Sequence, residues 1–92
     1  FKNMNKNIDK YFKTSSFYLA AFLFAKGLEL VNVDKTTDSK RAYFVFVDTP
    51  IRESLVGVFN YAKEDDPEAL VDARKIVQAV KTLKEKLYQD RF

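Results

Sequence analysis

The side chains in this 92-residue sequence with the strongest potential for metal chemistry are four carboxylates in one short segment, Glu64, Asp65, Asp66 and Glu68. Carboxylate oxygens are the ligands that Mg²⁺ and Ca²⁺ prefer. The segment lacks the ligand spacing of a calcium loop and the glycine at its turn. We therefore interpret residues 63–68 as a solvated acidic linker, and we expect no metal site.

Two pairs of carboxylates could in principle carry out acid–base catalysis: Asp34 with Asp38, and Asp48 with Glu53. Asp34 and Asp38 flank a predicted hairpin turn, and Asp48 precedes a predicted helix start. Structural roles explain these positions, and nothing in the sequence marks a cleft around them. We expect a protein that is not an enzyme and has no catalytic residues.

The composition excludes several other kinds of site. The chain has no histidine and no cysteine, which rules out, within one chain, zinc sites built on these residues, catalytic triads and disulfides. Its only glycines are Gly27 and Gly57, too few for a phosphate-binding loop or a dinucleotide fingerprint. We expect no cofactor and no small-molecule substrate. The lack of cysteine fits a reducing compartment, and we expect a cytoplasmic protein.

Basic residues are concentrated at the two ends of the chain. Residues 1–14 carry four lysines against one aspartate, and residues 72–92 carry six basic against three acidic side chains, whereas residues 15–71 have an acidic excess. Such ends are typical of a solvated surface, and they are also a pattern that contacts nucleic acid. The candidate contacts to nucleic acid, besides the arm, are Lys40, Arg41, Arg74, Lys75, Lys81, Lys84 and Lys86.

The elements that would position these residues begin with nine consecutive apolar residues, Phe17–Ala25. Ser16 is a favourable N-cap and Gly27 a favourable C′ residue, so we predict a helix over residues 16–26. Such a helix is too short to span a bilayer, and we expect no membrane partner. Because it is apolar on all sides, it must be covered on more than one side.

The rest of the chain predicts a hairpin and two more helices. Residues 28–34 and 40–48 have the composition of β-strands and are joined by a polar loop. Thr49 as N-cap and Pro50 at the first helical position indicate the start of an amphipathic helix that ends near Lys63. Asp72 is a natural N-cap for a long helix over residues 73–89, and residues 69–71 could form a third strand or a buried connector.

These elements indicate an α+β fold in which a β-hairpin, with or without a short third strand, packs against three helices in the order α-β-β-α-(β)-α. A two-stranded sheet is marginal by itself, so it needs the helices, a third strand or a second subunit. We expect a basic N-terminal arm over residues 1–13 and a single domain over residues 14–92.

Several blocks of sequence resemble a family of short bacterial and phage proteins known only as a domain of unknown function. The blocks are the T-S-x-F-Y-L-A-A-F-L opening with its K-G within Thr14–Gly27, the F-x-F-x-D strand at Phe44–Asp48, and the V-D-x-R…L-K-x-L-Y helix within Val71–Tyr88. They stand in the same order, and the resemblance covers about residues 11–89. It implies a small cytoplasmic domain, often encoded near mobile elements, with no recognised catalytic residues.

Two functional hypotheses remain. The first is a non-catalytic protein-interaction module that self-associates through the first helix or the hairpin, since these segments carry more apolar surface than a small domain easily hides. Its candidate interface residues are Phe17, Tyr18, Phe22, Tyr43 and Val45. The second is a nucleic-acid-associated accessory protein of a phage or mobile element that uses the basic C-terminal helix and the arm.

Overall fold

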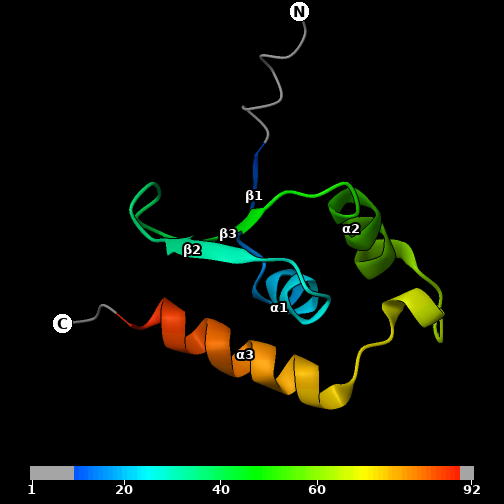
Figure 1. Cartoon of the computed structure of the whole chain (residues 1–92). Coiled ribbons are helices and arrows are strands. Elements are labelled where there is room, and N and C mark those ends of the chain that lie inside the picture. The colour runs from blue at the N-terminus through cyan, green and yellow to red at the C-terminus, as the bar shows by residue number, and fades with distance from the viewer. Residues whose placement is uncertain (1–9, 90–92) are drawn as a thin grey trace, which may run out of the picture.

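The computed structural model describes residues 10–89, which contain a three-stranded sheet and three α-helices (Figure 1). The α+β class predicted from the sequence is confirmed. The elements in chain order are β1 (Tyr11–Thr14), α1 (Phe17–Ala25), β2 (Leu30–Asp34), β3 (Tyr43–Val47), α2 (Arg52–Tyr61), the short 3₁₀ helix η2 (Pro67–Ala69) and α3 (Ala73–Leu87).

The third strand of the sheet is β1, from the segment expected to be an arm. The connector considered for this role, residues 69–71, forms no strand: Ala69 ends the 3₁₀ helix η2, and Leu70 and Val71 belong to no helix or strand. The strand order is β1-β3-β2, and both edge strands pair antiparallel with β3. The edge strands therefore run parallel to each other, joined through α1. The remainder of the arm, residues 1–9, lies outside the described residues.

Local side-chain chemistry sets the ends of α1 as the sequence predicts. The Ser16 hydroxyl accepts a hydrogen bond from the Leu19 N–H at 3.1 Å, which satisfies one of the unpaired donors at the helix start. Gly27 has a φ of +104°, the left-handed region in which a side chain would be strained. The chain can therefore leave the helix there and enter β2.

The predicted hairpin is confirmed as β2 and β3. Asp34 organises the loop between them, because its carboxylate accepts hydrogen bonds from the backbone N–H groups and the hydroxyls of Thr36 and Thr37. The register shifts between Leu30 and Asn32, which marks a bulge in β2.

Helix α2 starts later than predicted. Its N-cap position is Ile51, which makes no side-chain cap, and the hydroxyl of the expected cap Thr49 is buried without a partner among the described residues. The Thr49 carbonyl instead accepts from the Arg52 N–H in the turn that precedes the helix. No residue of α2 is fully buried, because the helix packs mainly against α1 at the side of the molecule (Figure 1).

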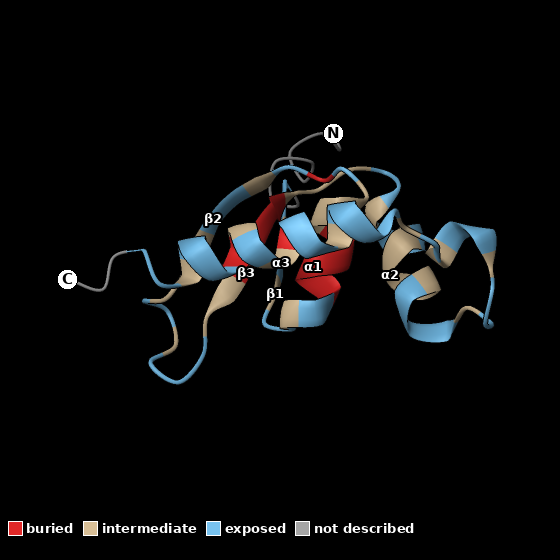
Figure 2. Ribbon diagram, turned by 90° about the horizontal axis from the view of Figure 1, so that it is seen from below, coloured by how far each residue is buried: buried red, intermediate tan, exposed pale blue. Residues whose placement is uncertain are grey.

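The core lies between the sheet and the pair α1 and α3. Figure 2 shows the buried segments at α1 and β3, with α3 packed against them. Phe44 and Phe46 of β3 reach this core from the sheet, and Ala79 and Leu83 reach it from α3. Figure 1 shows both helices on one side of the sheet, and none of the described helices lies over the opposite side.

The apolar surface of α1 is largely covered by its own chain. Five consecutive residues in its middle are buried, and Tyr18 is the residue of this helix that remains mostly exposed, at 74%. Helices of the described chain are too short or too polar to cross a membrane. Helix α1 is therefore a core helix.

Candidate functional site

The acidic linker uses its carboxylates as local caps. Asp66 accepts a hydrogen bond from the Glu68 N–H at 2.9 Å and so begins η2. Asp65 has a positive φ of 69°, a turn conformation that aspartate tolerates better than most residues. Within residues 10–89, no three His, Cys, Asp or Glu side chains converge as a metal site would require.

The paired carboxylates considered for catalysis also hold the backbone. The Thr36 and Thr37 donors lower the pKa of Asp34 far below its usual range, because they stabilise the ionised carboxylate. Asp38 accepts from the Lys40 N–H at 2.8 Å and lies 3.8 Å from the Arg41 guanidinium. These carboxylates shape one loop, and they do not face a shared cavity as an acid–base pair would.

Asp48 does not pair with Glu53 but with Arg52 of α2, and so it joins the end of the sheet to that helix. Its two oxygens accept from Arg52 at 3.0 and 3.2 Å, and this pairing raises the pKa of the Arg52 guanidinium. The guanidinium also lies over the ring of Phe12, 4.3 Å from its centroid. The pair therefore links β1, the end of β3 and α2.

The predicted interface residues do not form one surface. Phe17, Tyr18 and Phe22 belong to α1, on the helical side of the sheet, and Phe22 is only 5% exposed. Tyr43 and Val45 lie on the other side, because strand alternation places them opposite Phe44 and Phe46. Two separate surfaces must therefore be considered.

The first surface is an apolar groove of about 480 Å³ between α1, α2, the connector and α3. Tyr18, Phe59 and Leu70 are its most exposed members, at 74%, 40% and 61%. The sequence indicated Tyr18 and Phe22, but the contribution of the connector could be found only once the helices were placed. The groove is lined by Tyr18, Ala21, Phe22, Val58, Phe59, Ala62, Ala69, Leu70, Val71, Ile76 and Val80.

The surroundings of the groove are acidic on the linker side. Residues 63–68 connect two groove-lining positions, Ala62 and Ala69, and they carry four carboxylates against Lys63. A second lysine, Lys26, is already engaged: its Nζ donates to the Leu70 carbonyl at 3.1 Å and lies over the Phe22 ring. The groove therefore combines an apolar floor with a negative flank.

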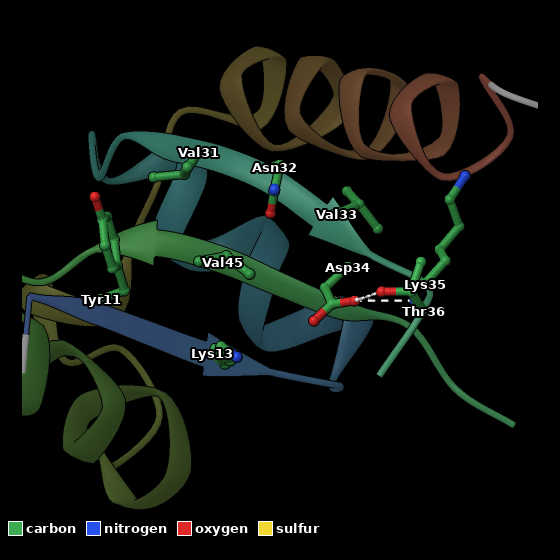
Figure 3. Close-up of a pocket in the computed structure, with 9 residues that line it drawn as sticks. All are labelled: Tyr11, Lys13, Val31, Asn32, Val33, Asp34, Lys35, Thr36 and Val45. Atoms are coloured by element: carbon green, nitrogen blue, oxygen red, sulfur yellow. Dashed lines mark hydrogen bonds between the residues drawn. The ribbon is translucent and has the colours of Figure 1, made fainter. Parts of the chain in front are cut away.

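The second surface is the side of the sheet that no described helix covers, here called the open face. It is formed by Tyr11, Lys13, Asn32, Asp34, Tyr43, Val45 and Val47, with Val31 at the bulge. Most of these side chains line a shallow hollow of about 520 Å³. Figure 3 shows Val45 on β3 between the lining residues of β1 and β2. Lys35 also lines the hollow, but its side chain extends toward α3, where its Nζ donates to the Leu87 carbonyl at 2.8 Å.

The cations proposed for nucleic acid are all exposed. Five of them lie along α3, where Arg74 pairs with its neighbour Asp72 at 3.1 Å and lowers the pKa of that carboxyl. The fold also brings Lys40 and Arg41 beside the C-terminal end of α3, where they line one hollow with Leu87 and Tyr88. The arm residues Lys2 and Lys6 lie outside the described residues.

Comparison with known proteins gives one match. The model of a protein family, described as "Domain of unknown function (DUF5659)", matches residues 9–89. No curated protein and no solved structure matches significantly.

Proposed function

We propose that this chain, which belongs to the family Domain of unknown function (DUF5659), is a non-catalytic protein-interaction domain whose apolar groove binds an amphipathic segment of another protein. The observation that carries the proposal is the groove itself: an apolar concavity with Tyr18, Phe59 and Leu70 exposed at its mouth. An exposed apolar patch of this kind commonly marks a binding site.

The shape and chemistry of the groove favour a helical occupant. Three helical elements and the connector line it, as in domains that receive the apolar face of an amphipathic helix. Exposed tyrosines at such a site are typical anchors, since the ring offers a large contact area and the hydroxyl remains solvated.

The charge beside the groove indicates the flanks of the partner. The linker carries four carboxylates and one lysine, so a segment with Lys or Arg beside its apolar face is favoured over an acidic one. The carboxylates nearest to catalytic spacing are engaged in turns and in the Asp48–Arg52 pair, which supports a binding role without catalysis.

The groove can be tested with Tyr18→Lys and the matched control Tyr61→Lys. Both tyrosines are largely exposed, at 74% and 85%, but Tyr18 lines the groove whereas Tyr61 does not. The probe is a labelled synthetic helix of about 15 residues with Leu on one face and Lys on the other. We expect Tyr18→Lys to weaken its binding about tenfold or more and Tyr61→Lys to change it less than about twofold, by fluorescence anisotropy.

A second peptide, with Glu in place of Lys, tests the charge of the partner. It should bind more weakly than the basic peptide, and the difference should shrink as salt rises. Equal loss in both tyrosine variants, equal binding of the two peptides, or no binding of either peptide would each argue against the proposal.

A second candidate function is contact with nucleic acid, which the convergence of Lys40 and Arg41 with the end of α3 supports. The expected test result is a steep salt dependence. With about four phosphate contacts, affinity for duplex DNA should fall on the order of 10²-fold between ~50 and ~200 mM salt.

Matched charge reversals locate that contact. The double variant Lys81→Glu, Lys84→Glu should weaken binding and make the salt slope shallower by about two. Lys63→Glu, an exposed lysine of the linker, should have a much smaller effect. A slope near zero, or an equal effect of Lys63→Glu, would exclude α3 as the contact.

A further inference from the structure

The open face of the sheet has an unusual pattern for a solvated surface. In antiparallel sheets with one face toward water, that face is normally polar. Here the outward residues of the central strand are half-buried Tyr43 and Val47, with Val45 between them only 7% exposed. Exposed Tyr11 and Val31 extend the apolar area, at 49% and 44%. Among the described elements, no helix packs over them (Figure 1).

Charges of opposite sign flank this apolar strip. Lys13 lies on the edge strand β1, and Asp34 lies on the other edge strand, β2. Their register partners are Val45 and Tyr43, which point to the same face, so both charges lie on the open face with the apolar strip between them. Figure 3 shows β3 between the two edge strands that carry Lys13 and Asp34.

We propose that two copies of this chain associate face to face through their open faces, about a two-fold axis parallel to β3. This rotation places β1 of each copy over β2 of the other, and β3 over β3. The interface uses the same surface on both copies, as a two-fold symmetric dimer requires. Each strip of Tyr43, Val45 and Val47 then covers the other, at the spacing of about 10 Å at which sheets pack.

The same rotation brings each Lys13 near the Asp34 of the other copy. Along the strand direction, the two positions differ by two residues, because Lys13 lies opposite Val45 and Asp34 lies opposite Tyr43. Two residues span about 7 Å, a distance that a lysine side chain can largely cover. The contact occurs twice in the dimer, so the charge pattern is complementary to itself.

Both groups are suited to this pairing. Within residues 10–89, Lys13 makes no ion pair or side-chain hydrogen bond with a described residue. Asp34 is held ionised by its threonine donors. Three of its four hydrogen bonds fall on Oδ1, so Oδ2 accepts from the Thr37 hydroxyl and keeps a further acceptor position. The pairing therefore leaves the hairpin loop intact.

This inference is independent of the groove, which lies on the helical side of the sheet. The groove variant Tyr18→Lys should leave the dimer unchanged, and the sheet variants should leave peptide binding unchanged. Failure of one proposal can therefore be distinguished from failure of the other.

The test is sedimentation velocity of the full chain between ~10 µM and ~1 mM, a range that covers weak dimers. We expect a monomer–dimer equilibrium that Lys13→Glu weakens about tenfold or more, because the carboxylate introduced on each copy would meet the Asp34 of the other. Lys63→Glu makes the same charge change on the helical side and should leave the equilibrium unchanged.

A charge-swapped mixture makes the test specific. Asp34→Lys alone should also weaken the dimer, because two lysines would meet at each pairing. An equimolar mixture of Lys13→Glu with Asp34→Lys should instead form a heterodimer in preference to either homodimer, since opposite charges then meet at both pairings. If Asp34→Lys disturbs the loop in circular dichroism, the comparison of Lys13→Glu with Lys63→Glu decides. A wild-type chain that stays monomeric at ~1 mM, equal effects of the two lysine variants, or a well-folded mixture that associates no better than its components would overturn the proposal.

Discussion

Replacement of Phe46 by alanine is expected to destabilise the domain by about 3–5 kcal/mol. Phe46 is fully buried in the central strand, with Phe12 and Leu30 as its register partners on the two edge strands. Its ring belongs to the core between the sheet and α1. Truncation removes a large buried area and leaves a cavity that three strands and a helix cannot easily close.

The effect should be close to the whole stability of the domain. A chain of this size has a free energy of unfolding of about 5–10 kcal/mol, so Phe46→Ala should shift the urea midpoint strongly and populate the unfolded state near room temperature. Tyr61→Ala, at an 85% exposed position, is the control and should change stability by less than about 0.5 kcal/mol. A loss below about 1 kcal/mol for Phe46→Ala would mean that β3 is not the centre of the core.

Replacement of Leu83 by alanine is expected to cost about 2–5 kcal/mol. Leu83 is fully buried on α3 and belongs to the core cluster, and α3 makes its main contacts with α1. Alanine is a better helix former than leucine, so helix propensity does not add to the cost. The measured loss should therefore report the packing of α3 against the core.

Val77→Ala on the same helix is the matched control for this prediction. Val77 is 58% exposed, and alanine favours the helix over valine, so the change should be near zero or slightly stabilising in urea unfolding. If the two variants lose similar amounts of stability, or if Leu83→Ala unfolds α3 without changing the unfolding transition of the sheet, then α3 does not pack as the structure describes.

The elements with strong local signals were predicted well. Ser16 and Asp72 are side-chain caps, and Gly27 has the positive φ expected after a helix. These features depend on hydrogen bonds within a few residues, and neighbouring sequence is enough to specify them. The hairpin was predicted for the same reason, although its strands are shorter than the predicted ranges.

The elements without such signals were placed incorrectly or left open. Strand β1, Tyr11–Thr14, is only four residues long, so its composition gave little indication of β structure. Its partner is β3, about thirty positions or more further along the chain, and no local signal specifies that pairing. Thr49 had the residue type of a cap, but the backbone turn at residues 49–52 uses its carbonyl and leaves its hydroxyl buried. Val77 of α3 and Tyr88 at its C-cap are apolar or aromatic yet exposed, which their residue types alone did not indicate.

The candidate sites divide in the same way. The amino-acid sequence alone was enough for the family resemblance, the helix caps, the hairpin, the positions of the cations and the absence of histidine and cysteine, because these are properties of single residues or short segments. The packed fold was needed to show that Phe17, Tyr18 and Phe22 lie on the opposite side of the sheet from Tyr43 and Val45. It was also needed to show that the connector joins α1 and α2 in one groove, and that Lys13 and Asp34 flank one face. Which apolar side chains become covered depends on contacts between segments distant in the sequence, whose combined burial determines the fold.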